Sequence, residues 1–182
     1  MPFENVITLK NGESVTLRFA KAEDAASLIG YLTRVWRQTY YLLTDGTEQT
    51  YTVSDEENYI ASHAENTRNF LILAETNGTI IGNCSFEEIS FLKRVRHRCS
   101  LGIVVDKKYQ GMGLGRVMMC FAIEFARQKG YEQMELEVVS GNDAALGLYK
   151  SLGFEQTGII PRAIKYAEKD YADIIIMVKN LT

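Results

Sequence analysis

The feature that most constrains this chain is a glycine-rich turn at residues Gln110 to Arg116, with the sequence Gln-Gly-Met-Gly-Leu-Gly-Arg. It stands between an apolar segment, Leu101 to Val105, and an amphipathic helical pattern that begins near Leu114. Glycine lets the backbone approach a ligand closely, and the first N–H groups of a helix lack internal partners and favour negative charge. The order strand, glycine turn and helix N-terminus therefore predicts a cradle for a phosphate-bearing ligand, although a purely structural turn is the alternative.

Two common phosphate motifs do not fit this turn. A nucleotide-hydrolase loop needs Gly, four residues, Gly, then Lys and Ser or Thr, and the chain has no such run. The dinucleotide motif Gly-x-Gly-x-x-Gly fails as well, because its third glycine would fall on Arg116 or on Met118. The remaining pattern is Gln-x-x-Gly-x-Gly, from Gln110 to Gly115.

A second motif runs from Gly141 to Phe154, directly after the β-rich segment Met134 to Val139. Asn142 suits the N-cap of a short helix and Gly153 suits its C-terminal end. Asn142 and Tyr149 are seven residues apart, which places them on one side of the helix about 10 Å apart. Both side chains can therefore line a single elongated ligand, or Tyr149 can simply pack on the sheet.

The two motifs together resemble those of the GNAT family of N-acetyltransferases, whose motifs are Arg/Gln-x-x-Gly-x-Gly and Asn-x-x-Ala-x-x-x-Tyr-x-x-x-Gly-Phe. The resemblance implies that acetyl-CoA is the cosubstrate and that no metal takes part. It also implies a backbone donor to the acetyl carbonyl, a cradle for the pyrophosphate, and contacts from Asn142 to the pantetheine arm and from Tyr149 to the sulfur. The donor to the acetyl carbonyl is implied to come from Ile103, Val104 and Val105. The pyrophosphate cradle is implied to comprise Gln110, Gly111, Met112, Gly113, Leu114, Gly115 and Arg116.

Acetyl transfer to an amine needs both an acid and a base. An alkylamine with a pKa near ~10 is protonated at neutral pH, so a base or a water chain must remove a proton. The thiolate leaving group needs a proton in turn, and Tyr149 is the candidate acid, a role that the resemblance supports.

The base is harder to assign. Many members of the family place a glutamate just before the Leu-Gly element of the central strand, but this chain has Ser100 there. Glu87 and Glu88 end the preceding strand pattern and point to opposite faces if the strand continues. We select Glu88 as the candidate base, with ordered water as the alternative; His63 and His97 have suitable intrinsic pKa values but no motif around them.

Periodicity and turn signals predict an α/β (α+β) fold in one domain that spans residues 1–182. Asn77-Gly78 predicts a β-hairpin, and strand–helix–strand units after Leu101 predict local parallel pairing. We expect a mixed, mostly antiparallel seven-stranded sheet with about four helices on both faces, and the resemblance implies that the sheet splays at its centre. The expected strands are Val15–Phe19, Phe70–Glu75, Thr79–Phe86, Arg98–Val105, Met134–Val139, Glu155–Ile164 and Asp173–Val178, and the expected helices lie near residues 25–36, 55–69, 114–130 and 142–152.

Composition narrows the classes of partner that the chain is expected to bind. The net charge of −3 gives no electrostatic case for nucleic acid or an anionic membrane, and no run approaches the ~18 apolar residues of a membrane span. Three cysteines without CxxC spacing and an N-terminus without a signal sequence predict reduced thiols and a cytoplasmic location. The apolar last strand, Ile174 to Val178, favours coverage on both faces and makes a homodimer plausible.

Two functions remain open. The first is an N-acetyltransferase that moves the acetyl group to a primary amine by direct attack on the thioester in a ternary complex; the amine is a small amine, an amino acid or a peptide N-terminus. The second is an acyl-CoA-binding sensor without turnover. We expect the acceptor to lie under a lid at Trp36 to Asn58, with Arg162, Tyr166 and Tyr171 as further candidates.

Overall fold

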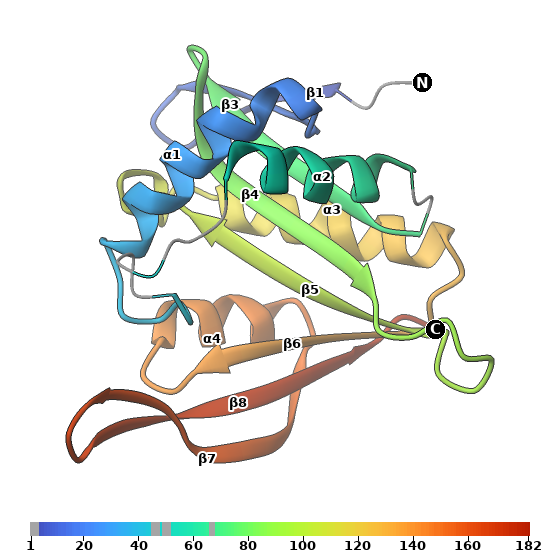
Figure 1. The fold of residues 1–182 in the computed structure, drawn as a ribbon. Helices are drawn as coiled ribbons and strands as arrows, with labels where there is room; N and C mark the ends of the chain where they lie inside the picture. The colour runs from blue at the N-terminus through green and yellow to red at the C-terminus, as the bar shows by residue number, and fades with distance from the viewer. Residues whose placement is uncertain (1–3, 45–47, 49–51, 66–67) are drawn as a thin grey trace.

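The computed structural model describes residues 4–44, 48, 52–65 and 68–182 (Figure 1). A mixed sheet of eight strands has the order β1-β2-β3-β4-β5-β6-β8-β7. The strands are β1 (Glu4–Thr8), β2 (Ser14–Phe19), β3 (Phe70–Thr76), β4 (Thr79–Glu88), β5 (Arg98–Val105), β6 (Gln133–Val139), β7 (Glu155–Ala167) and β8 (Asp170–Asn180). The α-helices are α1 (Ala25–Trp36), α2 (Val53–Glu65), α3 (Leu114–Gln128) and α4 (Asp143–Ser151), and short 3-10 turns cover Ala22–Asp24 and Lys107–Tyr109.

The sheet is covered on both faces because its inner strands are apolar on both sides. In β3, Phe70, Ile72 and Ala74 join one core, whereas Leu71 and Leu73 join the other. Helices α3 and α4 cover the first core and α1 and α2 cover the second. Figure 1 shows α1 and α2 in front of the sheet and α3 behind it. The prediction of a mixed α/β sheet with helices on both faces is confirmed.

The centre of the sheet contains its parallel strand pair. Strands β5 and β6 are paired through three positions only, from Arg98 opposite Gln133 to Ser100 opposite Glu135. Beyond that point β5 stays paired with β4 as far as Val105, and β6 stays paired with β8 as far as Val139. The facing edges of β5 and β6 therefore diverge and form a fork, as the resemblance implied (Figure 1).

The expected strand count was wrong by one. Strand β1 was missed because it is a polar edge strand that pairs with β2 alone, and four of its five residues are exposed. Such a strand lacks the alternation of buried and exposed side chains that reveals a strand in a sequence. The last two strands are longer than expected, and α2 ends at Glu65 rather than at Asn69.

Candidate functional site

The open end of the fork leads to the glycine-rich turn. Helix α3 begins at Leu114, directly after Gly113, whose φ of 97° lies in the left-handed region that favours glycine. The first helical bond runs from the N–H of Val117 to the carbonyl of Gly113, so the N–H groups of Leu114, Gly115 and Arg116 have no intrahelical acceptor. An ideal Cβ at Gly113 would meet no atom within 4 Å. The turn thus presents free donors to open space, which is what an anion cradle requires.

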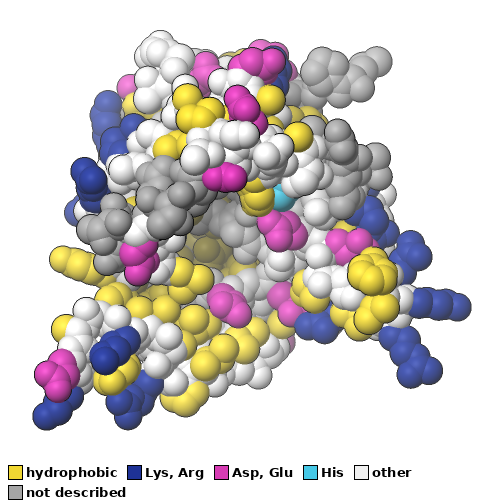
Figure 2. Space-filling view, in the orientation of Figure 1, with side chains coloured by type: hydrophobic (Ala, Val, Ile, Leu, Met, Phe, Trp, Pro, Cys, Tyr) yellow, Lys and Arg dark blue, Asp and Glu magenta, His cyan; other side chains and the backbone are white. Residues whose placement is uncertain are grey.

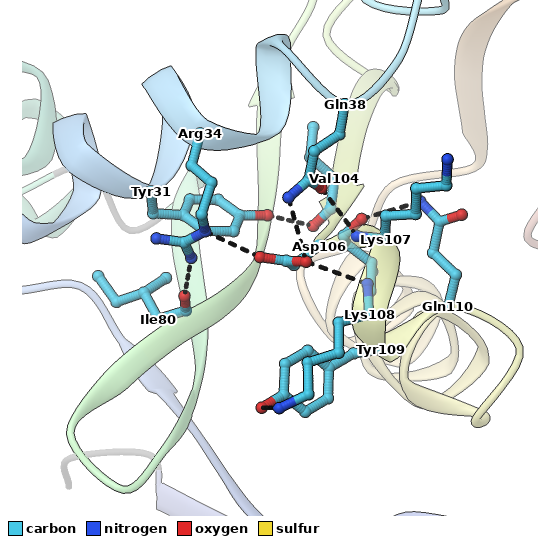
Figure 3. A network of polar contacts seen from close by, with 11 residues as sticks. Tyr31, Arg34, Gln38, Ile80, Val104, Asp106, Lys107, Lys108, Tyr109 and Gln110 are labelled. Atoms are coloured by element: carbon cyan, nitrogen blue, oxygen red, sulfur yellow. Dashed lines mark hydrogen bonds and ion pairs between the residues drawn. The ribbon is translucent and has the colours of Figure 1, made fainter.

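The predicted cradle residues have different tasks in the structure. The side chain of Leu114 is fully buried in the core, so only its backbone faces the turn. The Arg116 guanidinium donates to the Ser151 hydroxyl at 2.7 Å and joins α3 to α4. The Gln110 amide donates to the carbonyl of Val105 at 3.0 Å and therefore folds back onto the end of β5 (Figure 3).

A polar network holds the end of β5 against α1 (Figure 3). The buried carboxylate of Asp106 accepts from Arg34 Nε at 2.9 Å, from Gln38 Nε2 at 3.3 Å and from the Lys108 N–H at 3.1 Å. Burial alone would raise the pKa of Asp106, but these donors outweigh it, and the pKa lies below its ordinary value. The turn that precedes the glycines is therefore fixed by a charged contact to a helix on the opposite face of the sheet.

Tyr149 and Asn142 lie on α4 as the motif predicted. Asn142 is the N-cap, and its side-chain oxygen accepts from the N–H of Ala145 at 3.3 Å. Tyr149 is buried in the core shared with α3, and burial raises the pKa of its phenol to about 12. Its hydroxyl forms no hydrogen bond with any residue that the structure describes. A neutral phenol with a free O–H, in the core that Ile103 and Val105 of β5 also join, is suited to donate a proton.

The structure separates the two neighbouring glutamates of β4. The side chains of β4 alternate between the faces, and Phe86 belongs to the core under α3, so Glu88 points to that side. There its carboxylate pairs with Arg68 Nε at 2.9 Å. Glu87 points to the α1/α2 face and lies opposite Ser100 on β5. The candidate base Glu88 therefore lies on the opposite face of the sheet from Glu87, and a salt bridge with Arg68 holds its carboxylate.

Glu87 belongs to a cluster with α2. Its Oε1 accepts from the Tyr59 hydroxyl at 3.1 Å and lies 3.4 Å from Nε2 of the buried His63. The His63 contact holds the pKa of Glu87 below its ordinary value. Burial lowers the pKa of His63, but Glu87 and the Tyr59 carbonyl outweigh burial and leave that pKa raised. His97, the other histidine, lies before β5, where its carbonyl accepts from Glu132.

Glu137 on β6 is a further carboxylate near the fork that was not selected from the sequence. Met134, Leu136 and Val138 of β6 enter the core under α3 and α4, so Glu135 and Glu137 point to the α1/α2 face. Arg98 binds Glu135 through two hydrogen bonds, whereas Glu137 is exposed and has no partner among the described residues. Glu137 lies beyond the last β5–β6 pair, at the open fork. Its position five residues before Asn142 was the signal available in the sequence.

The expected lid is described only in part, because residues 45–47 and 49–51 lie outside the described residues. The Tyr41 hydroxyl donates to the carbonyl of Gly141 at 2.9 Å, next to the α4 N-cap. The Tyr166 hydroxyl on β7 donates to the carbonyl of Tyr40 at 2.7 Å. The segment after α1 thus connects α4 and β7, while Arg162 stacks over Tyr171 with the guanidinium 4.1 Å from the ring centroid.

Other expectations concern metals, membranes and thiols. In the described ranges no group of three or more His, Cys, Asp or Glu side chains is arranged to hold a metal ion. No helix among these residues is both long and apolar enough to cross a membrane. Cys84, Cys99 and Cys120 are free cysteines. The basic residues Lys93, Arg94 and Arg96 lie before β5, at the opposite end of that strand from the glycine turn.

Comparisons with known proteins agree with this geometry. A sequence model described as the acetyltransferase (GNAT) family matches residues 20–154. The L-amino acid N-acyltransferase MnaT of Escherichia coli is 30% identical over 150 residues, which are 81% of this chain and 84% of that protein. A methionine sulfoximine/methionine sulfone acetyltransferase of Salmonella typhimurium is 29% identical over 81% of this chain and 84% of that protein.

Solved structures give the same result. A GNAT acetyltransferase from Streptococcus pneumoniae is 31% identical and superposes with a TM-score of 0.86, over 92% of this chain and 99% of the other. The putative acetyltransferase yncA of Salmonella typhimurium, solved with acetyl-CoA, is 25% identical with a TM-score of 0.80, over 92% and 94% of the two chains.

Proposed function

Because the chain belongs to the GNAT family of acetyltransferases, we propose that it transfers the acetyl group of acetyl-CoA to a primary amine by direct attack on the thioester in a ternary complex. The observation that carries the proposal is the fork between β5 and β6. It leads from the donor-rich turn at Gly113 to the free hydroxyl of Tyr149, so one elongated ligand can contact both. The yncA protein, a relative solved with acetyl-CoA, supports this choice of ligand.

The cradle would hold the pyrophosphate through backbone donors. The N–H groups of the first turn of α3 supply the donors, and the helix dipole adds a favourable field. Asn142 would contact the pantetheine arm, and backbone groups from Ile103 to Val105 on the open edge of β5 would hold the acetyl carbonyl. Acetyl-CoA supplies the activated acyl group as a thioester, while the protein orients it and moves the protons.

Tyr149 would protonate the departing thiolate. Its phenol is neutral at pH 7 even at the ordinary tyrosine pKa, and burial raises that pKa further, to about 12, so the proton is present when the sulfur needs it. Tyr149→Phe should therefore slow thiol release more than it weakens acetyl-CoA binding.

We place the base on Glu137 instead of Glu88. Glu137 is exposed at the fork on the face opposite Tyr149, whereas Glu88 is paired with Arg68 on the other face. A carboxylate at the fork can take the proton of the attacking amine directly or through one water. Glu137→Gln is expected to lower kcat by about 10²- to 10⁴-fold, and Glu88→Gln should leave it within a few fold. Equal losses in both variants would contradict this assignment.

The alternative is a sensor that binds acyl-CoA without turnover. Incubation with acetyl-CoA and a panel of amines, amino acids and peptides separates the two functions, since transfer releases free CoA thiol. The named relatives act on amino acids or their analogues, which supports a small primary amine as acceptor. We also propose that the protein is cytoplasmic and forms a homodimer.

A further inference from the structure

A cavity of about 390 Å³ opens between α1, α2 and the inner strands β3 and β4, on the α1/α2 face. One part of its wall is apolar and comes from leucines, and the other part is polar and comes mainly from α2. Figure 2 shows this face hollowed near its centre, with carboxylates at the rim. The lining residues are Leu28, Leu32, Asp55, Glu56, Tyr59, Leu71 and Asn83.

Two acceptor groups in the wall lack donors. Glu56 is only 6% exposed, and its carboxylate forms no hydrogen bond or ion pair with any described residue; the charge of His63, on the same helix, acts on it without a direct contact. The side-chain oxygen of Asn83 is buried and has no hydrogen-bond partner in the described chain. Buried polar groups are almost always hydrogen-bonded, because an unpaired one costs the full desolvation penalty. The Glu56 carboxylate therefore lacks a donor that a ligand in the cavity can supply.

The chemistry of the wall selects the charge of that ligand. Among the described residues, the lining contains no lysine, arginine or histidine, and Asp55 and Glu56 give it negative charge. Burial raises the pKa of Glu56 and the charge of His63 opposes that rise only in part, so a bound cation would offset the remainder. An ammonium group carries three donors and one positive charge, and the leucine side chains suit the methylenes attached to it. A substrate carboxylate in this cavity would face Glu56 and be repelled.

The distance from the cavity to the fork sets the length of the ligand. Asn83 on β4 lies opposite Val104 on β5, and the fork begins at the free edge of β5. Two strand spacings of about 4.8 Å give roughly 10 Å between Asn83 and a group in the fork. An extended chain advances roughly 1.2 Å per bond, so the two sites are about eight bonds apart.

We propose that the acceptor is a long α,ω-diamine or polyamine, whose distal ammonium binds in this cavity against Glu56 and Asn83 while its other amine attacks the thioester. The inference rests on the proposed function and names its substrate class. In the reaction the amine nitrogen forms a bond to the acetyl carbon and the carbon–sulfur bond breaks. The proton of the amine passes to Glu137 and the thiolate takes the proton of Tyr149, after which proton exchange with water restores the carboxylate and the phenol. The distal ammonium is unchanged.

The test compares a seven-carbon α,ω-diamine with heptylamine, which has the same length and no distal charge. We expect kcat/KM for the diamine to exceed that for heptylamine by about 10- to 100-fold, the effect of one charge-assisted contact. Glu56→Gln should remove this advantage and leave heptylamine unaffected. Glu57→Gln is the matched control, since Glu57 is the exposed neighbour on the same helix.

A wild-type enzyme that uses both amines equally would overturn the proposal, and so would equal effects of the Glu56 and Glu57 variants. A second measurement tests the cavity independently of acetyl transfer: the shift in Tm that the diamine alone produces. A shift in the wild type that Glu56→Gln abolishes and Glu57→Gln retains supports the cavity even if no amine is acetylated. No shift in the wild type, or an equal shift in all three proteins, overturns it.

Discussion

Substitution of Gly113 by alanine separates the backbone role of this residue from its role toward the ligand. With φ at 97°, an alanine is strained by about 1–2 kcal/mol. For a chain of this size each kcal/mol moves Tm by about 2–4 °C, so Gly113→Ala should unfold roughly 2–8 °C below the wild type. The new methyl group meets no protein atom within 4 Å, so strain is the only cost that we expect to the fold itself.

The effect on ligand binding should be larger. The methyl group would enter the space in front of the free N–H groups of α3, where we place the pyrophosphate. Acetyl-CoA at a concentration 100-fold above its Kd should stabilise the wild type by about 2.7 kcal/mol, or roughly 5–11 °C in Tm. In Gly113→Ala this protection should be absent at the same acetyl-CoA concentration. Differential scanning fluorimetry with and without acetyl-CoA measures both effects.

Gly130 provides the matched control. Its φ is 77°, an added Cβ there also meets nothing within 4 Å, and it lies beyond the far end of α3. Fifteen helical residues place it about 22 Å from the cradle. Gly130→Ala should lower Tm to a similar degree and keep the full acetyl-CoA shift. If Gly113→Ala also kept the full shift, the cradle would be assigned to the wrong turn.

Three further predictions concern the residues around the fork. Asp106→Ala removes three hydrogen bonds at the end of β5, which should lower the free energy of unfolding by roughly 2 kcal/mol and Tm by about 4–8 °C. An unchanged Tm would show that the network of Figure 3 does not stabilise the fold. Asn142→Ala removes the N-cap of α4, so the free energy of unfolding should fall by about 1 kcal/mol, and the Kd for acetyl-CoA measured by calorimetry should rise. If Asn142 caps the helix without contacting the ligand, Tm alone will change. The Glu87–His63 pair stabilises the fold when the carboxylate is ionised and the imidazole is protonated, so Glu87→Gln should lower Tm most between pH about 5 and 6.5. The difference should shrink above the raised pKa of His63 and below pH ~4.5, and a pH-independent difference would contradict it.

The parts of the fold that the sequence predicts are those with strong local signals. The Asn77-Gly78 turn, the apolar run of β3, and the Asn142 and Gly153 ends of α4 are each visible within a few residues of the sequence. Strand β1 has a weaker signal, since Ile7 alone of its five residues packs against a core and the strand pairs only with β2.

The candidate site likewise contains residues that local motifs predict and residues whose placement depends on the tertiary structure. The glycine turn and the pair Asn142 and Tyr149 are local motifs, so their elements could be placed from the sequence. The face to which Glu87, Glu88 and Glu137 point depends on register and on which side each helix covers. The cavity at Glu56 and Asn83 combines α2 with β4, and no short pattern connects those two segments.

The central claim is tested most directly by CoA thiol release in the presence of acetyl-CoA and an amine panel, measured together with acetyl-CoA affinity for the wild type and Tyr149→Phe. We predict amine-dependent thiol release with formation of the acetylated amine, and a Tyr149→Phe variant that binds acetyl-CoA with nearly unchanged affinity but releases thiol much more slowly. Tight acetyl-CoA binding with no thiol release for any amine, amino acid or peptide would contradict the account and favour a sensor.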